Sequence, residues 1–414
     1  MVTSGPQIQT LRILKDINAE YYEQARDASR RGRPVGFVNV FAPTELFYAM
    51  DIVPIYPENH AAFLQARKLT LEVSSPSEEL GYLPGLCSYA LCDMGYFITG
   101  KSPVGGLPMP DFFLTTNAQC GTLTKWFERM SQHFHVPLFL VDVPFTGGKP
   151  ENRHCREYVR SQILDLINFL EEISGKPLDH DELQRTIHSS NRTISLWQEI
   201  INSARHVPSP ISVFDQFISM APIVAQRGSQ AALEFYHELK GEIDGRVSRG
   251  TGAVADERFR LYWDSLPLWH ELKWLSELLN SFGACLVSTI YTLPWAQFHL
   301  DPTDPISSWV DEYIHYFDWH LNRRVDLILE FKERYCLNGF IYHNDRSCKM
   351  FSTAIPQIKR MVEEKSGIPG YILEADHGDP RFYSRDQIEE GLTYYFELLE
   401  TRQELPGKRR LMPE

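Results

Sequence analysis

Cysteine is scarce in this sequence, and long apolar runs are missing from it. Seven cysteines in 414 residues are too few, and an odd number, for a disulfide framework. No stretch approaches the roughly eighteen consecutive apolar residues that a membrane-spanning helix needs. The first residues show no basic segment followed by an apolar one, which a secretory signal would have. We therefore expect a cytoplasmic protein without a membrane span, whose thiols stay reduced and free for metal binding or catalysis.

Positive charge and short catalytic motifs are scarce as well. The 41 Lys and Arg residues face 54 Asp and Glu residues, so the net charge is -13. Nucleic-acid binders carry a basic surface, and this balance argues against such a partner. The spacings C-x-x-C, H-E-x-x-H and G-x-S-x-G do not occur. What the chain does have is 43% hydrophobic and 12% aromatic residues, enough for a large core and for two domains with a connecting element.

Short apolar runs alternate with helical patterns in both halves of the chain. Strand, helix and strand at this spacing predict parallel sheets. The fold class that we expect is therefore α/β, with two Rossmann-like or flavodoxin-like lobes. The runs that predict strands are 36–41, 53–56, 112–117, 137–142, 259–262, 285–291, 339–343 and 370–374.

The region between the two lobes has a helical pattern. Helices are predicted over 158–173, over 182–201 with Asp181 as the N-cap, and over 211–240. Such an insert is expected to pack across both lobes or to contact another subunit. The predicted parts are an N-terminal lobe over 1–150, a helical connecting region over 151–250 and a C-terminal lobe over 251–414.

One arrangement of strand, cysteine and helix occurs twice. The run 112–117 is followed by Cys120 and a helix, and the run 340–344 is followed by Cys348 and a helix. In open α/β sheets ligands gather outside the carboxyl ends of the strands, and a helix N-terminus favours a thiolate over a thiol. We predict that the lobes face each other and bring Cys120 and Cys348 to one metal centre. Cys87, in a glycine-flanked loop outside the repeat, is the third predicted ligand.

The other cysteines have a simpler interpretation. A lone cysteine in a reduced protein is most often a small buried apolar residue, which we predict for Cys155, Cys285 and Cys336. Cys92 lies five residues after Cys87 and is an alternative, spare ligand, but a separation of one and a half helical turns predicts that it points away from the site.

Two further patterns are weak. Residues 95–102 fit the phosphate-binding pattern G-x-x-x-x-G-K-[ST], but the interior is bulky and Pro103 follows where a helix should continue, so we expect a chance match. Tryptophans and tyrosines between Tyr262 and Trp295 either line an aromatic pocket or belong to the core.

Several motifs in a fixed order resemble one family over nearly the whole chain. It is the benzoyl-CoA reductase and 2-hydroxyacyl-CoA dehydratase family, whose type is the 2-hydroxyglutaryl-CoA dehydratase D component. The motifs are Pro43-x-Glu45-Leu46, Cys87-Ser-Tyr, Asn117-x-x-Cys120, Gly175-Lys-Pro-Leu-Asp179, Arg346-Ser-Cys348, Gly367-Ile-Pro369 and Asp379-Pro-Arg-x-Tyr-Ser384.

The resemblance implies a 4Fe-4S cluster held by Cys87, Cys120 and Cys348, with one iron left open. It also implies a related partner subunit in a heterodimer, and a separate iron-sulfur activator that hydrolyses ATP to deliver single electrons. The implied substrate is an acyl-CoA or aryl-CoA thioester.

Polar residues beside the cysteines and on the loops of the first lobe receive roles from their positions. Ser88, Asn117 and Ser347 are expected to donate hydrogen bonds to the ligand sulfurs. Glu45 and His60 are the candidate catalytic groups for proton transfer. Their alternative interpretation is an ordinary first-turn acid of a helix and a surface histidine.

Two reactions are implied, and we favour the first. An ATP-driven benzoyl-CoA reductase reduces the aromatic ring by single-electron steps, and Met50-Asp51 and the motif at 379–384 favour this branch. A 2-hydroxyacyl-CoA dehydratase instead eliminates water through a ketyl radical. A third alternative is a non-catalytic or electron-transfer member, including one with a double-cubane cluster.

Overall fold

The eight predicted runs form eight strands in the computed structural model, which describes residues 5–145, 152–316 and 320–403. The strand ends differ from the predicted ends by up to three residues, as expected when only the pattern is known. The strands are β1 (Val35–Val38), β2 (Val53–Ile55), β3 (Phe112–Thr116), β4 (Leu138–Val141), β5 (Phe259–Asp264), β6 (Ala284–Thr289), β7 (Gly339–Asp345) and β8 (Gly370–Ala375).

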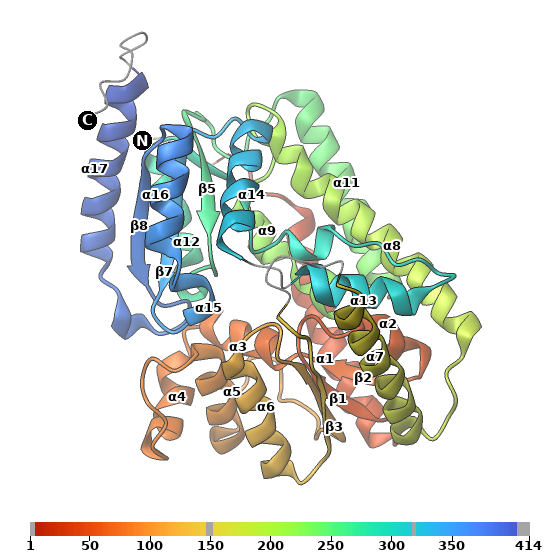
Figure 1. Ribbon diagram of the computed structural model, residues 1–414. Coiled ribbons are helices and arrows are strands. Elements are labelled where there is room, and N and C mark those ends of the chain that lie inside the picture. Colours follow the sequence, from red (N-terminus) through yellow and green to blue (C-terminus); the bar gives the residue numbers. More distant parts are fainter. Residues whose placement is uncertain (1–4, 146–151, 317–319, 404–414) are drawn as a thin grey trace.

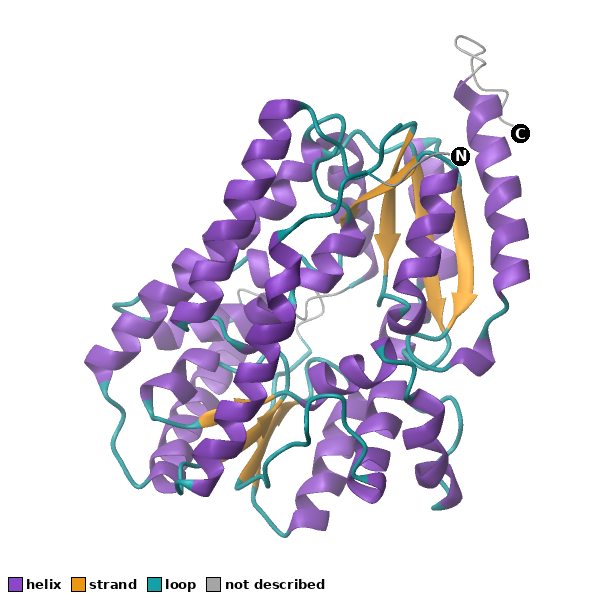
Figure 2. Cartoon of the chain, turned by 180° about the vertical axis from the view of Figure 1, so that it is seen from behind, coloured by secondary structure: helices purple, strands orange, loops and turns teal. Residues whose placement is uncertain are grey.

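The strands make two parallel four-stranded sheets with the same internal order. The first sheet runs β2-β1-β3-β4 and the second runs β6-β5-β7-β8. This order matches the first four strands of the flavodoxin-like sheet. The predicted α/β class with two parallel-sheet lobes is confirmed, and β3 and β7 occupy corresponding places. The arrowheads of the second sheet point toward the first lobe (Figure 2).

Strand composition follows from burial on both faces. Every residue of β1, β3 and β5 is buried, whereas the outer strands β4 and β8 are partly exposed. Parallel strands covered by helices on both sides read as continuous apolar runs. This explains why runs such as Phe112–Thr116 could be recognised without any alternation of polar residues.

Helices cover the first sheet and fill its connections (Figure 1). The amphipathic α1 buries Tyr22, Ala25 and Ala28 on one face. The helices of this lobe are η1 (Thr10–Ile13), α1 (Leu14–Arg30), α2 (Thr44–Ala49), α3 (Pro57–Ala66), α4 (Thr70–Glu79), α5 (Ser88–Thr99) and α6 (Gly121–Phe134).

The helical insert differs from its prediction in two places. Asp179, and not Asp181, caps the second long helix, because its carboxylate accepts the Glu182 N–H at 2.9 Å. The single helix predicted over 211–240 is wrong, since Gly228 takes a left-handed φ of 93° and Ser229 caps a new helix. The observed elements are α7 (Arg153–Ser174), α8 (His180–Asn202), η2 (Ser203–Arg205), α9 (Val213–Ser219), α10 (Ala221–Ala225) and α11 (Gln230–Arg249).

The insert packs across both lobes. The Ser190 hydroxyl on α8 donates to Glu45 of the first lobe at 2.5 Å, and the Trp197 indole on α8 donates to the Thr292 carbonyl of the second lobe at 3.2 Å. One continuous apolar core includes Leu114 of β3, Trp197 of α8 and Trp263 of β5. The lobes and the insert are therefore held together by a shared core.

The second lobe repeats the alternation of strand and helix. Its helices are η3 (Trp269–Glu271), α12 (Leu272–Ser281), η4 (Pro294–Ala296), α13 (Pro305–Tyr316), α14 (Leu321–Arg334), α15 (Lys349–Ser352), α16 (Ile355–Ser366), η5 (Pro380–Phe382) and α17 (Arg385–Gln403). None of the helices in the described ranges has the length and apolar character to span a bilayer.

The start of the chain does not stay with the first lobe. The Gln9 N–H donates to Glu242 of α11 at 2.8 Å, and the Gly5 N–H donates to the Ala253 carbonyl at 3.2 Å. The boundaries 1–150, 151–250 and 251–414 stay a prediction.

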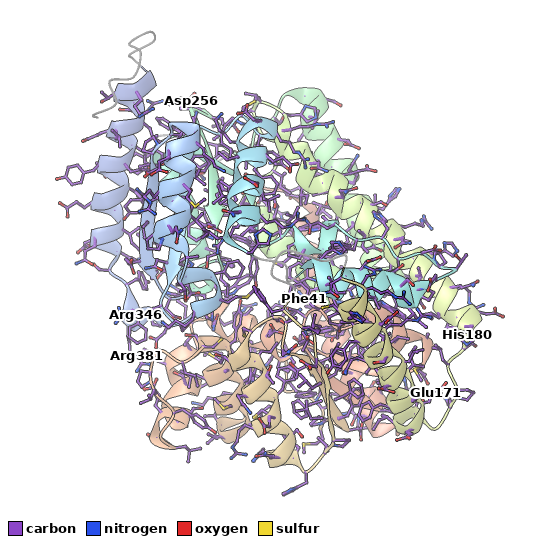
Figure 3. The ribbon with its side chains drawn as sticks, in the orientation of Figure 1. Phe41, Glu171, His180, Asp256, Arg346 and Arg381 are labelled. Carbon is purple, nitrogen blue, oxygen red and sulfur yellow. The ribbon has the colours of Figure 1, made fainter. Side chains whose placement is uncertain are left out.

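At the outer edge where the lobes meet, Arg381 donates to Glu78 of α4 at 3.0 Å (Figure 3).

Gly95 is required by helix packing and not by phosphate binding. It lies inside α5, so residues 95–102 do not form a phosphate loop. A Cβ on Gly95 would lie 1.6 Å from the Val73 carbonyl oxygen of α4. We expect Gly95→Ala to lower the free energy of unfolding by at least about 3 kcal/mol, the upper range for overpacking. Urea unfolding measures it.

The matched control is Gly241→Ala in α11. A Cβ there meets no atom within 4 Å. Because alanine is the better helix former by about 1 kcal/mol, this variant should be as stable as the parent or more stable. Equal stability of the two variants would contradict the packing role of Gly95.

Candidate metal centre between the lobes

The three predicted ligands open into one cavity. It has a volume of about 330 Å³ and is lined by Cys87 and Cys120 from the first lobe and Cys348 from the second. Phe217 on α9 and Val224 on α10 complete the wall from the insert. The structure thus brings together three thiols that are far apart in the sequence.

Each of the three cysteines is the N-cap of a helix: Cys87 for α5, Cys120 for α6 and Cys348 for α15. The Leu123 N–H donates to the Cys120 sulfur at 3.3 Å, whereas the side chains of Cys87 and Cys348 accept no such capping bond. Backbone N–H groups at a helix N-terminus stabilise negative charge on sulfur. The sequence predicts a helix N-terminus for Cys120 and Cys348 but a loop for Cys87. The loop prediction for Cys87 is wrong, because Cys87 also stands directly before a helix.

The environment of Cys120 and Cys348 opposes negative charge on sulfur unless a cation is present. Burial and the charge of Cys87 raise the pKa of Cys120 to about 12. Burial, together with the charge of Asp345, raises the pKa of Cys348 well above its usual value. A metal bound by such thiols deprotonates them outright. The helix termini and a metal would therefore act together to hold three thiolates here.

The donor set of the three thiols is soft. Thiolates bind zinc or an iron-sulfur cluster, so the chemistry of these side chains fits either kind of centre. A second group in the described ranges, Asp345, Asp376 and His377, has ligand atoms that all lie within 4.8 Å of one another.

The walls of the cavity are aromatic. From the predicted aromatic cluster, Trp269, Tyr291 and Trp295 line the cavity. The Trp295 ring stacks on Phe41, with ring centres 5.2 Å apart and planes 9° apart, and Phe41 lies at the centre of the molecule (Figure 3). The Trp269 indole donates to the Tyr89 hydroxyl. The pocket interpretation holds for these residues, whereas Tyr262 and Trp263 belong to the core.

Glu58 is a cavity residue that the sequence did not reveal. One carboxylate oxygen accepts the Val40 N–H at 2.9 Å, and the other accepts the Gln119 amide at 2.5 Å. Burial raises the pKa of Glu58 from 4.5 to about 7, because these two bonds only partly offset the desolvation. A carboxyl group with this pKa can both give and take a proton near neutral pH.

The two predicted proton-transfer residues lie elsewhere. Glu45 is 1% exposed, pairs with Arg227 at 3.0 Å and accepts from Ser190. The ring Nε2 of His60 lies 2.9 Å from the Ser102 hydroxyl, and burial lowers the His60 pKa to about 3. Neither lines the cavity as far as the structure describes it. Their polar contacts hold the first lobe to the insert and to the loop after α5.

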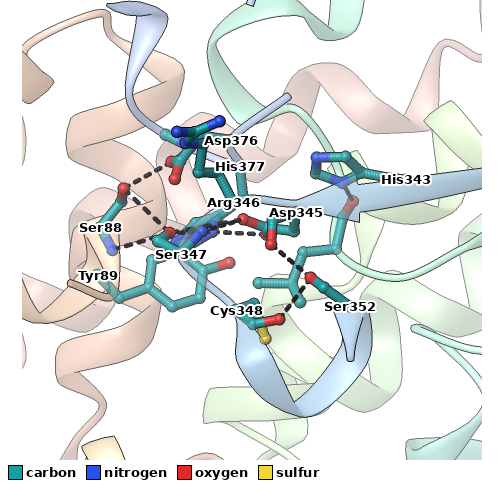
Figure 4. A network of polar contacts seen from close by, with 12 residues as sticks. Ser88, Tyr89, His343, Asp345, Arg346, Ser347, Cys348, Ser352, Asp376 and His377 are labelled. Carbon is teal, nitrogen blue, oxygen red and sulfur yellow. Dashed lines mark hydrogen bonds and ion pairs between the residues drawn. The ribbon is translucent and has the colours of Figure 1, made fainter. Parts of the chain in front are cut away.

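Polar residues beside the cysteines join the lobes instead of bonding to sulfur (Figure 4). The Ser88 hydroxyl donates to Asp376 at 2.6 Å, and the Ser88 N–H donates to the Ser347 hydroxyl at 3.4 Å. Ser88 thus uses both its hydroxyl and its N–H between the lobes, and its expected donation to sulfur is wrong. Asn117 uses one of its two amide protons on Asp142 within the first lobe, so its donation to sulfur stays a prediction.

The remaining cysteines show mixed outcomes. Cys285 is buried, as predicted, and Cys155 is half-buried. Cys336 is exposed, so its predicted burial is wrong; it lies in a left-handed turn with φ of 51° after α14. Cys92 is buried in α5 outside the cavity, with its sulfur 3.9 Å from the Gln65 amide.

Fold and site together define a two-lobed α/β protein with a thiol-lined cavity between the carboxyl ends of two parallel sheets. A family model described as 2-hydroxyglutaryl-CoA dehydratase, D-component, matches residues 39–399. The chain belongs to that family, as the order of its motifs predicts.

Known relatives are subunits of two kinds of enzyme. The alpha subunit of lactoyl-CoA dehydratase from Anaerotignum propionicum is 30% identical over 395 residues, which cover 91% of this chain and 93% of that protein. The alpha subunit of (R)-2-hydroxyisocaproyl-CoA dehydratase from Clostridioides difficile is 30% identical, with coverage of 95% and 97%. One of the subunits of benzoyl-CoA reductase from Thauera aromatica is 28% identical, with coverage of 94% for each chain.

Proposed function

We propose that this chain is the cluster-binding subunit of an enzyme that transforms an acyl-CoA thioester by one-electron chemistry. Cys87, Cys120 and Cys348 would hold a 4Fe-4S cluster, which supplies single electrons at low potential when bound. The observation that carries the proposal is the convergence of three helix-capping thiols from two lobes on one cavity.

The cavity suits a bulky apolar acyl group. Its walls are mainly apolar and include several aromatic rings, and few polar side chains reach it. Such walls exclude water, which strengthens electrostatic interactions with the reacting group. The exposed Arg67 lies among the lining residues and offers a positive charge for the phosphates of CoA outside the cavity.

Dehydration of a 2-hydroxyacyl-CoA is the reaction that we put first. The family description and two relatives at 30% identity carry dehydratase names. Eliminating water requires that one proton leaves the substrate and that the departing hydroxyl gains one. Glu58, whose pKa is raised to about 7 by burial, is the carboxyl group in the cavity that suits this exchange.

Reduction of benzoyl-CoA is the second candidate, and the aromatic cavity favours it. A flat ring fits between walls such as Trp269, Tyr291 and Trp295. The similarity to a benzoyl-CoA reductase chain supports the same reaction. Glu58 would then supply a proton to the reduced ring.

The proposed partners are a related second subunit and an activator that hydrolyses ATP. The relatives are all named as single subunits of larger enzymes, which supports a multi-subunit assembly. The deciding experiment assays the anaerobic complex with its activator and ATP on a 2-hydroxyacyl-CoA with an aromatic side chain and on benzoyl-CoA. Turnover of the hydroxyacyl substrate alone supports the dehydratase, and turnover of benzoyl-CoA alone supports the reductase. Turnover of neither contradicts the proposal.

The raised pKa of Glu58 predicts a pH-dependent cost in stability. The folded protein binds this proton more tightly than the unfolded chain, so stability falls as pH rises from about 4.5 to about 7. The neutral Glu58→Gln variant escapes this loss. Relative to the parent it should gain up to about 3 kcal/mol at pH 8 and nothing at pH 4. Urea unfolding at both pH values measures the difference.

The matched control is Glu79→Gln at the end of α4. This side chain is exposed, so the same loss of charge should leave the stability unchanged at both pH values. A pH-independent difference between Glu58→Gln and the parent would contradict the raised pKa.

A further inference from the structure

Two tyrosine hydroxyls meet on the wall of the cavity, one from each lobe. Tyr89 lies in the first turn of α5, next to Ser88 (Figure 4). Tyr291 lies two residues after Thr289, the last residue of β6. Both side chains line the cavity together with the three thiols, and their hydroxyl oxygens are 3.3 Å apart. The pair therefore stands where the substrate of the proposed reaction would lie.

The hydrogen-bond donors at this pair outnumber the bonds among them. The Trp269 indole N–H donates to the Tyr89 hydroxyl, and an indole nitrogen can only donate. Each tyrosine adds one proton, but the two oxygens share a single contact in which either can be the donor. Within the part of the chain that the structure describes, neither hydroxyl has a further hydrogen bond. One hydroxyl proton is thus left for the molecule that occupies the cavity.

The unused proton is assigned to Tyr291 by exposure. Tyr89 is 7% exposed, and its ring packs against His377, another cavity residue, with the ring centres 4.4 Å apart. Tyr291 is only half-buried. Because a buried donor without a partner costs free energy, the favoured direction leaves the more exposed hydroxyl free. Donation then runs from Trp269 to Tyr89, from Tyr89 to Tyr291, and from Tyr291 into the cavity.

The Tyr291 ring is held in place by its neighbours. Phe217, Trp269 and Trp295 meet it edge to face, with ring centres 5.9, 6.2 and 6.4 Å away. Its backbone N–H donates to the Thr289 hydroxyl at 3.1 Å. A purely structural role fits less well, because a phenylalanine would fill the same space without leaving a proton unused. A donor fixed in this way needs no reorganisation when charge develops on a bound group.

We propose that the Tyr291 hydroxyl donates a hydrogen bond to the carbonyl oxygen of the bound thioester. This inference rests on the proposed function, because it takes the substrate to be a CoA thioester, and both candidate substrates contain this carbonyl. When the cluster gives up one electron and the substrate gains it, part of the added negative charge falls on the carbonyl oxygen. A fixed donor stabilises that charge more than it stabilises the neutral carbonyl.

The role of Tyr291 differs from that of Glu58. A tyrosine has an ordinary pKa of about 10, so Tyr291 keeps its proton near neutral pH and acts as a hydrogen-bond donor. Glu58, in contrast, is the group proposed to exchange a proton. The Tyr291→Phe variant should therefore keep the shape of the pH profile of kcat, with lower values throughout, whereas Glu58→Gln should lose the limb that Glu58 contributes.

The first test measures binding without turnover, in the anaerobic complex without activator or ATP. The ligands are the substrate thioester and its thioether analogue, in which a methylene group replaces the carbonyl. Phenylalanine keeps the ring that packs against Phe217 and Trp269 and removes only the hydroxyl. We expect the preference for the thioester over the thioether to fall about fivefold in Tyr291→Phe, the size of one neutral hydrogen bond. Isothermal titration calorimetry measures the four affinities.

The second test adds the activator and ATP. The kcat of Tyr291→Phe should fall by about 10²-fold, the loss of one donor to a developing negative charge on oxygen, at unchanged iron content. Tyr342→Phe is the matched control. Tyr342 is fully buried in β7, outside the cavity lining, and its hydroxyl has no hydrogen-bond partner in the described ranges. Its replacement should change neither the affinity preference nor kcat.

An unchanged preference in Tyr291→Phe with full iron content overturns the proposal. A loss of preference and of kcat in Tyr89→Phe but not in Tyr291→Phe overturns it as well, because Tyr89 would then be the donor. A parent protein that neither binds nor turns over an acyl-CoA or aryl-CoA thioester instead refutes the proposed function, so the two failures are distinguishable.

Discussion

Replacing Cys348 with alanine is expected to remove most of the iron from the anaerobically purified protein. Cys348 supplies the only thiol among the described cavity residues that comes from the second lobe, and two thiolates from the first lobe cannot enclose a cluster. Turnover of the acyl-CoA substrate should fall at least about a hundredfold, since even outer partners of metal ligands cost 10–100-fold. Iron analysis and the absorption of the cluster measure the first effect directly.

Cys92→Ala is the matched control for this loss. Cys92 is buried in α5 five residues after Cys87, but it lies outside the cavity. Its replacement should leave the iron content unchanged and cost only packing energy. Full iron content in Cys348→Ala would show that the three cysteines do not form the ligand set.

Glu58→Gln is expected to lower kcat by about 10²–10⁴-fold, the range for the loss of a general acid or base. The amide keeps the shape of the side chain but cannot exchange a proton. Iron content should stay at the parent level, because the hydrogen bonds described for Glu58 go to Gln119 and Val40 and not to a cysteine. The loss should appear in kcat more than in KM, since the group acts during the reaction and not in binding.

His60→Gln tests whether Glu58 or His60, which the sequence analysis proposed, is the group that transfers the proton. The glutamine amide can preserve the bond to Ser102, and His60 does not line the cavity. Its kcat should therefore remain within about twofold of the parent, in the range of a change away from the chemistry. A large loss in His60→Gln together with normal turnover in Glu58→Gln would reverse the two assignments.

Much of the fold was predictable because burial on two faces leaves a strong signal. Runs such as Phe112–Thr116 and Gly339–Asp345 are buried along almost their whole length. The repeat of strand, cysteine and helix placed Cys120 and Cys348 at corresponding points of two sheets. Their convergence followed from the rule that ligands gather at the carboxyl ends of strands.

The missed features depend on contacts that a linear pattern does not contain. Glu58 reads as an ordinary acid in the first turn of α3, and only its contacts with Val40 and Gln119 reveal a buried carboxyl. The prediction of one continuous helix over 211–240 was wrong, because Gly228 and Ser229 interrupt this stretch. His377 could have been found, since it follows a predicted strand at its carboxyl end between Asp376 and Gly378.

The division of the three thiols between two lobes also fixes an order of maturation. Cys87 and Cys120 are made early on the ribosome, but their third companion lies in the last quarter of the chain. If these thiols hold the proposed cluster, the full ligand set exists only after the second sheet has formed and docked on the first, so cluster insertion would follow docking. The bound cluster would then link the two lobes, and the closure of so long a loop is expected to stabilise the folded protein.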